Sequence, residues 1–119
     1  ADMSKVEIHV GGSFADTKRR VLAAVARAER DEGAEPEVHI TFETWEALAA
    51  VMTPKRIELL RHLHRQPEAS IAALSRALGR DYKRVHEDVE ALVAAGLINR
   101  EEGGLLRAGY DEIRASVAL

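Results

Sequence analysis

The chain contains 119 residues, of which 46% are hydrophobic and 31% charged, a composition typical of one globular domain or of a small domain with an added arm. It has no cysteine, so disulfides and thiolate metal sites are excluded and a reducing cytosol fits well. No apolar run approaches the ~18 residues that a membrane span needs, and no signal peptide is recognisable. We therefore expect a cytoplasmic protein without a membrane segment.

The formal net charge of −3 is distributed unevenly along the chain. Residues 1–52 carry a net charge of −4, residues 53–86 carry eight basic and three acidic side chains, and residues 87–119 again carry −4. A positive segment inside an acidic chain indicates a local contact surface for a polyanion such as DNA. The alternative is chance clustering of charges on solvated helix faces.

The N-terminal third predicts a strand, a helix and a second strand. Apolar and polar residues alternate at positions 6–10 and again at 38–42, which is the period of a half-buried strand. Apolar residues between these two segments recur at helical spacing, and Ser13 or Asp16 is expected to cap that helix. Residues 31–36 are expected to form a loop.

Several short helices are predicted next, each with a recognisable start or stop. A helix at 44–52 is interrupted by Thr53, because a residue before proline is pushed out of the helical region. Pro54 suits the first turn of the following helix. Ser70 is expected to cap the next helix, and Gly79 is suited to end it with a left-handed cap.

The last helix of the series, from about 81 to 95, has an apolar stripe and a charged face. The stripe is expected to face the core and consists of Tyr82, Val85, Val89, Leu92 and Val93. The opposite face begins basic and becomes acidic. The helix ends at Gly96, residues 100–107 predict two short strands around a glycine pair, and residues 113–119 predict a terminal strand.

Three helices followed by two short strands are the elements of a winged helix-turn-helix, whose last helix usually enters a DNA groove. We predict an α+β fold in which residues 1–42 form a strand–helix–strand arm for dimerisation or partner binding. Residues 43–119 would form the winged helix-turn-helix together with the C-terminal strand. The arm and the last strand have apolar faces that a chain of this size does not fully cover, so we expect a homodimer.

Several segments resemble the MarR-like winged-helix regulators of bacteria and archaea. The turn Leu78-Gly79-Arg80 and the sequence Gly96-Leu97-Ile98 are typical of winged helices, and residues 110–113 narrow the resemblance to this family. The full set of matching segments is 42–48, 59–60, 74–80, 89–92, 96–98 and 110–113. The resemblance implies DNA binding, dimerisation and repression of a neighbouring gene or of the protein's own operon. It also implies a possible role as an antitoxin, so a cognate toxin is a candidate partner.

Lysine and arginine side chains are the candidate site residues, because DNA carries dense phosphate charge. Those expected to contact DNA are Lys55, Arg56, Arg76, Arg80, Lys83, Arg84 and Arg107. Arg80, Lys83 and Arg84 start the last helix, where an arginine can donate two hydrogen bonds to guanine, worth about 1–3 kcal/mol of discrimination. The others are expected at phosphates, with Arg107 reaching phosphate or the minor groove. Two alternatives stay open: Arg80 satisfies carbonyls at the preceding helix end, and Arg84 pairs with Asp88 on the helix surface.

Other kinds of site find little support. His62 and His64 point to different faces of one helix, and His9 and His39 have no third metal ligand at readable spacing. No phosphate-binding glycine loop or nucleophile motif occurs. We expect no enzyme, no metal and no cofactor. The expected partners are double-stranded DNA, a second copy of the chain and a toxin. The alternative is a winged-helix protein-interaction module that does not bind DNA, which the acidic segments at both ends permit.

Overall fold

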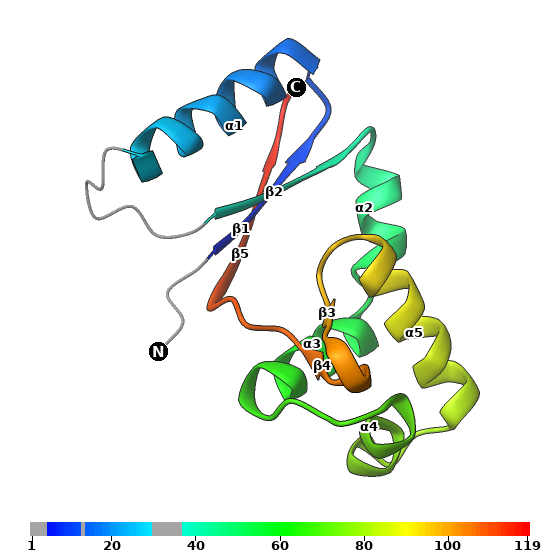
Figure 1. Ribbon diagram of the computed structural model, residues 1–119. Coiled ribbons are helices and arrows are strands. Elements are labelled where there is room, and N and C mark those ends of the chain that lie inside the picture. The colour runs from blue at the N-terminus through cyan, green and yellow to red at the C-terminus, as the bar shows by residue number, and fades with distance from the viewer. Residues whose placement is uncertain (1–4, 13, 30–36) are drawn as a thin grey trace. The chain divides into compact units, whose positions relative to one another are not determined.

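The computed structural model describes residues 5–12, 14–29 and 37–119, which form an α+β fold (Figure 1). Its helices, with one 3-10 turn, are α1 (Phe14–Glu29), α2 (Trp45–Val51), α3 (Pro54–Arg65), α4 (Ile71–Leu78), α5 (Tyr82–Ala94) and the turn η1 (Glu102–Gly104). Its strands are β1 (Lys5–Val10), β2 (Glu37–Phe42), β3 (Asn99–Arg100), β4 (Leu106–Arg107) and β5 (Glu112–Val117). None of the described helices is long and apolar enough to cross a membrane.

Only some of the features expected around α1 lie within the described residues. The cap expected at Ser13 and the loop expected at 31–36 lie outside the described residues. α1 begins at Phe14, so Asp16 lies inside the helix and is not its cap.

The chain divides into two compact units. The first, which we call the sheet unit, contains the residues up to Ala49 together with Tyr110–Leu119. The second, the helical unit, is Ala50–Gly109. The sequence predicted a boundary between residues 42 and 43 and placed the C-terminal strand with the helices. The division differs because β5 hydrogen-bonds to β1, which is far away in the sequence.

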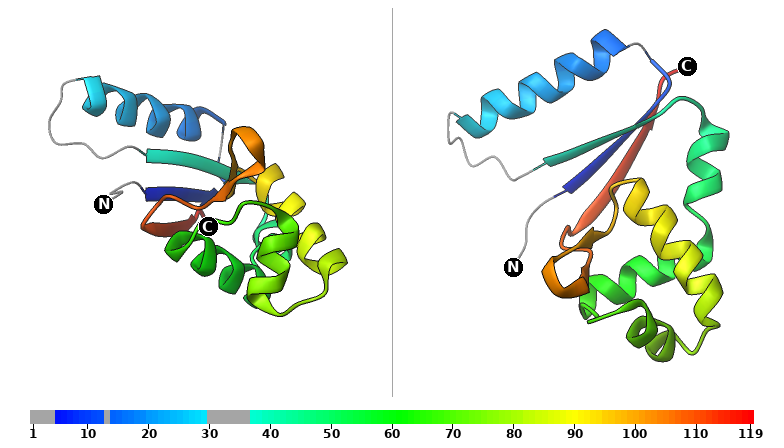
Figure 2. Two further views of the ribbon diagram at one scale, coloured as in Figure 1. Left: turned by 60° about the horizontal axis from the view of Figure 1, so that its bottom comes forward. Right: turned by 45° about the vertical axis from the view of Figure 1, so that its right-hand side comes forward.

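The sheet unit contains three parallel strands in the order β2-β1-β5. Ile8 lies opposite Ile40 of β2 and Ala115 of β5. Since partners in register share a face, the alternation of each strand produces one apolar face and one polar face. β1 is the central strand, and its three apolar side chains are almost fully buried: Val6, Ile8 and Val10. Parallel neighbours need a crossover, and α1 supplies the one between β1 and β2 (Figures 1 and 2).

The helical unit begins and ends its helices at the residues that the sequence indicated. The Thr53 hydroxyl accepts a hydrogen bond from the backbone N–H of Arg56 at 3.3 Å, at the start of α3. The Ser70 hydroxyl does the same for Ala73 at 3.0 Å, at the start of α4. Gly79 ends α4 with a φ of 64°, in the left-handed region that favours glycine. These caps satisfy backbone groups that each helix end would otherwise leave unpaired.

The core of the helical unit is aliphatic. It includes side chains of α3, α4, α5, the turn after α5 and β4 that are at most 4% exposed: Leu59, Leu60, Leu63, Leu74, Val85, Val89, Leu92, Leu97, Ile98 and Leu106. Burying one side chain of this size contributes about 1.5–3 kcal/mol. The hairpin closes through Glu101 N–H to the Leu105 carbonyl at 2.8 Å. The short strands expected within 100–107 are thus present as β3 and β4.

Candidate nucleic-acid interface

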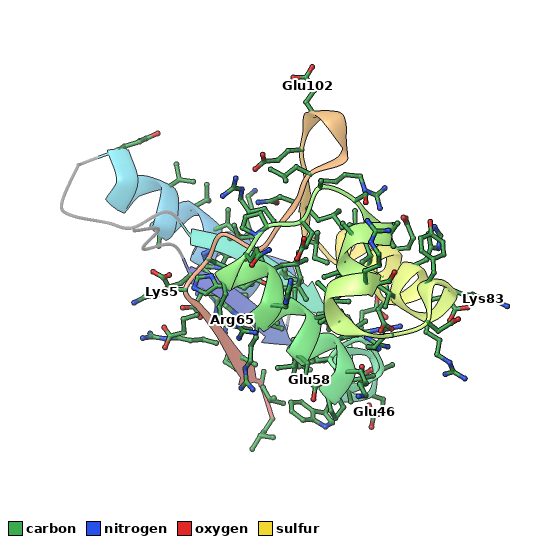
Figure 3. The ribbon with its side chains drawn as sticks, turned by 90° about the horizontal axis from the view of Figure 1, so that it is seen from below. Lys5, Glu46, Glu58, Arg65, Lys83 and Glu102 are labelled. Atoms are coloured by element: carbon green, nitrogen blue, oxygen red, sulfur yellow. The ribbon has the colours of Figure 1, made fainter. Side chains whose placement is uncertain are left out.

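The first turn of α5 presents two cations to solvent. The Asp81 carboxylate caps the helix by accepting a hydrogen bond from the backbone N–H of Arg84 at 3.2 Å. The side chains of Lys83 and Arg84 are exposed, and Figure 3 shows Lys83 projecting outward from the helix. Val85, next along the helix, is fully buried and anchors it to the core. Within the described residues neither cation forms an ion pair, so both keep the charge that phosphate contact requires.

Asp88 holds two of the other predicted site residues. Its Oδ1 accepts a hydrogen bond from Arg56 Nε at 3.0 Å, and its Oδ2 accepts one from Arg80 Nη2 at 2.8 Å. The three side chains are 14–19% exposed. The carboxylate on α5 therefore ties α3 and the α4–α5 turn together through charge-assisted hydrogen bonds, which are the stronger kind. Asp88 pairs with these two arginines and not with Arg84, the partner that sequence spacing offered.

Arg56 has a second structural contact. Its Nη1 donates to the carbonyls of Ala50 and Val51, each at 3.2 Å. These carbonyls belong to the last turn of α2, where backbone oxygens lack helical partners. The Arg56 guanidinium is thus bonded to Asp88 and to two backbone carbonyls, and its expected contact with a DNA phosphate stays a prediction.

Arg80 is also held by contacts inside the helical unit. Its backbone N–H donates to the Ser75 carbonyl at 3.1 Å, at the end of α4. Its side chain points to Asp88, and its Nη1 is buried without a hydrogen-bond partner in the described part of the chain. The side chain is therefore largely buried in the helical unit, at 19% exposed, and its expected contact with a DNA base stays a prediction.

The remaining predicted cations are exposed to different degrees. Arg76 on α4 is exposed, and no described residue forms an ion pair with it. Lys55 lies 3.7 Å from Glu58, with side chains 66% and 62% exposed, so this surface pair is worth little. Arg107 Nε donates to Glu101 Oε1 at 2.8 Å across the hairpin. Arg76 and Lys55 keep most of their charge available, whereas Arg107 shares its charge with an acid.

Tyr82 is not a core residue. The sequence placed it on the apolar stripe of α5, but the side chain is 52% exposed. Its ring lies beside that of His86, with centroids 5.9 Å apart. Tyr82 occupies the first position of α5, which lies beyond the core. The apolar stripe of the helix therefore extends past the core at this end. Its exposure beside Lys83 adds an aromatic surface to the basic turn, and only the position in the first turn could have indicated this.

The second half of α5 is acidic and exposed. Glu90 accepts a hydrogen bond from Arg100 of β3 at 2.5 Å, and this bond lowers the pKa of the Glu90 carboxyl. Glu87 is also exposed. The charge of α5 therefore changes sign along its length, as the sequence indicated.

Glu68 and His62 form a buried pair that sequence reasoning missed. Glu68 is 8% exposed, and its Oε2 lies 2.5 Å from His62 Nε2. The Glu68 backbone also exchanges two hydrogen bonds with Leu106, at 2.8 and 3.2 Å. The Glu68 backbone thus joins the α3–α4 turn to the hairpin, and its side chain joins the same turn to α3. No local sequence pattern indicates this pair, because its two residues meet only once the α3–α4 turn has formed.

A histidine cluster occupies the polar face of the sheet. Arg20 of α1 donates from Nη1 to His9 Nδ1 at 2.9 Å, and His9 Nε2 lies 2.9 Å from His39 Nδ1 on β2. Because Arg20 can only donate, His9 carries its hydrogen on Nε2 and donates it to His39. His9 is 5% exposed. Burial, the positive charge of Arg20 and the neighbouring His39 lower the pKa of His9, against a smaller raising effect of Glu7.

This cluster predicts a pH dependence of stability. Below the ordinary histidine value of 6.5, unfolded His9 takes up a proton that folded His9 does not. The free energy of unfolding is therefore expected to fall as pH decreases, by at most about 1.4 kcal/mol per pH unit for this one group. We expect His9→Gln to show a weaker dependence, because its amide can accept from Arg20 and donate to His39. Urea titrations at pH about 7.5 and about 5.5 check this; equal pH slopes in both proteins would contradict it.

No metal site is found among the residues that the structure describes. No group of three His, Asp or Glu side chains is placed to hold an ion. Both ring nitrogens of His9 are already hydrogen-bonded, Nδ1 to Arg20 and Nε2 to His39.

Comparisons with known proteins concern mainly the helical unit. The model of the HVO_A0114 family matches residues 51–115, just over half of the chain. A comparison with curated proteins finds no match, and neither does a comparison with solved structures. The matched segment contains α3, α4, α5 and the hairpin, and with them every predicted DNA-contact residue.

Proposed function

The chain belongs to the HVO_A0114 family, and we propose that its matched segment is a winged helix-turn-helix that binds double-stranded DNA. The order α3, α4, α5 and then the hairpin β3–β4 supports this reading. In such a module α5 is the recognition helix and the hairpin is the wing.

The observation that carries the proposal is the exposed basic turn at Lys83 and Arg84. Both side chains lie at the N-terminal end of α5, the end of a recognition helix that usually contacts base edges. The helix N-terminus adds backbone N–H groups and a positive dipole end that favour phosphate. Arg76, exposed on the preceding helix, would contact the DNA backbone.

Arg56 and Arg80 receive a different role in this proposal. Their bonds to Asp88 fix α5 against α3, so they position the recognition helix and do not contact DNA. A rigidly held helix lets the two exposed cations meet DNA without a further loss of conformational entropy.

The experiment is a salt titration of DNA binding. Lys83→Ala combined with Arg84→Ala should weaken binding to a duplex from upstream of the protein's own gene by roughly 10- to 100-fold. It should also reduce the slope of log K against log salt concentration by about 2, because two phosphate or base contacts are lost.

The matched control removes two exposed cations of the sheet unit, Arg19→Ala with Arg114→Ala. It changes the net charge equally and should leave both affinity and slope nearly unchanged. Equal losses in the two double variants would indicate a non-specific charge effect and would overturn the assignment of α5.

The proposal extends to regulation. A dimer that presents two copies of α5 would bind half-sites about 34–36 Å apart and would favour a palindromic operator. The MarR-like resemblance of the sequence supports a repressor or autorepressor, and an antitoxin that also binds a toxin.

One observation favours a second candidate function. Arg56 and Arg80 are largely buried, and α5 carries the exposed acids Glu87 and Glu90. The surface around α5 is therefore mixed in charge, which suits a protein partner. A winged-helix interaction module would show no salt-dependent binding to duplex DNA, so the same titration separates the two functions.

A further inference from the structure

α1 is hydrogen-bonded to the sheet through Arg20. The Arg20 guanidinium bonds to His9, whose ring is 5% exposed on the polar face of the sheet. At 100° per residue, the side of the helix opposite Arg20 carries Lys18, Leu22, Val25 and Glu29. Figure 2 shows α1 beside β2 in both views.

The apolar side of α1 is therefore exposed. Leu22 is 56% exposed, Val25 47% and Val21 37%. An amphipathic helix of a folded protein normally turns its apolar stripe toward a core. Here that stripe has no cover within the described residues. Three neighbouring apolar side chains on one helix face are more than the scattered exposure that folded proteins commonly show.

The order of residues along this stripe fits a second copy of the same helix. Lys18, Leu22, Val25 and Glu29 follow one another at intervals of four, three and four residues, which is the spacing of a helix–helix seam. If a second α1 packs antiparallel about a two-fold axis, Lys18 lies opposite the partner's Glu29, and Leu22 lies opposite the partner's Val25. In a parallel pair each charge would instead face its own copy.

We propose that α1 is the dimerisation seam of this protein and packs antiparallel against α1 of a second copy. The charges at its two ends are complementary only in that orientation, and both Lys18 and Glu29 are exposed without an ion pair among the described residues. The assignment does not rest on DNA binding, because self-association is measured in the absence of DNA.

The interface of this dimer would be small. Two helices of 16 residues bury less than the ~1,600 Å² of a standard interface, so dissociation is expected in the micromolar range. Sedimentation velocity from about 5 to about 500 μM covers that range. A wild-type chain that remains a monomer throughout overturns the proposal.

The first test removes the apolar contact. Leu22→Glu places a charge in the centre of the seam and should raise the dissociation constant at least ~100-fold. Ala23→Glu, an exposed position of the same helix outside the stripe, is the matched control and should dimerise like the wild type. Since both positions are exposed, both variants should keep the wild-type circular dichroism spectrum. Equal effects of the two changes overturn the proposed seam.

The second test determines whether the two α1 helices are antiparallel. Lys18→Glu alone, or Glu29→Lys alone, turns two attractive pairs into two repulsive ones and should weaken the dimer by about tenfold. The combined variant exchanges the charges and should restore wild-type association. In a parallel pair the single changes would have no such effect, so unchanged single variants, or a double variant that stays weak, overturn the antiparallel arrangement.

Discussion

Asp88→Ala is expected to lower the free energy of unfolding by about 3 kcal/mol, because it leaves the Arg56 and Arg80 guanidinium groups largely buried without a counter-charge. Arg80 already has one buried nitrogen without a partner, so little within the described residues can replace the lost acceptor. For a domain of this size the melting temperature should fall by roughly 10 °C or more. Urea titration followed by far-UV circular dichroism measures the change.

Two further variants serve as a control and an intermediate case for Asp88→Ala. Glu87→Ala removes the neighbouring exposed acid of the same helix and should change stability by less than about 0.5 kcal/mol. Asp88→Asn keeps an oxygen that can accept one hydrogen bond and should lie between the two. An Asp88→Ala protein as stable as Glu87→Ala would show that the two arginine bonds contribute nothing, and the positioning role given to Arg56 and Arg80 would be lost.

Leu92→Ala is expected to destabilise the chain by about 2–5 kcal/mol, the range observed when a buried leucine is truncated and a cavity remains. Leu92 is fully buried on α5. Its carbonyl also accepts hydrogen bonds from the N–H groups of Leu97 at 2.9 Å and Ile98 at 3.4 Å, so it lies where α5 turns into β3. Loosening this packing should reduce the urea midpoint strongly.

Leu119→Ala is the matched control for this change. It removes the same atoms from a side chain that is fully exposed, so no cavity forms and the midpoint should stay within the experimental error. Comparable losses in the two proteins would mean that the helical unit does not depend on its aliphatic core.

The helix limits and the strand periods could be predicted because they depend on neighbouring residues. Thr53, Ser70 and Asp81 each accept a hydrogen bond from a backbone N–H three residues later. Gly79 ends α4 with a positive φ that other residues rarely adopt. Each of these signals acts within one turn of helix, so sequence alone is enough to find it.

Which arginines form ion pairs and which are exposed could not be predicted in the same way. Arg80 and Arg84 are both arginines near the start of α5, yet Arg80 is held by Asp88 and Arg84 is exposed. Arg56 reaches the same carboxylate from 32 residues away. Which cation meets Asp88 depends on how α3 and α4 pack against α5, and no spacing rule contains that information.

The sequence by itself determined the local elements of this protein, the basic segment that contains Lys83 and Arg84, and the aliphatic character of the core. Propensity, capping and periodicity are short-range effects, so they are present in the chain before it folds. Only the tertiary structure decided that β5 joins β1, that Asp88 binds two of the arginines predicted to contact DNA, and that the apolar stripe of α1 faces outward. Those outcomes depend on contacts between residues far apart in the chain, whose energies exist only once the elements have packed.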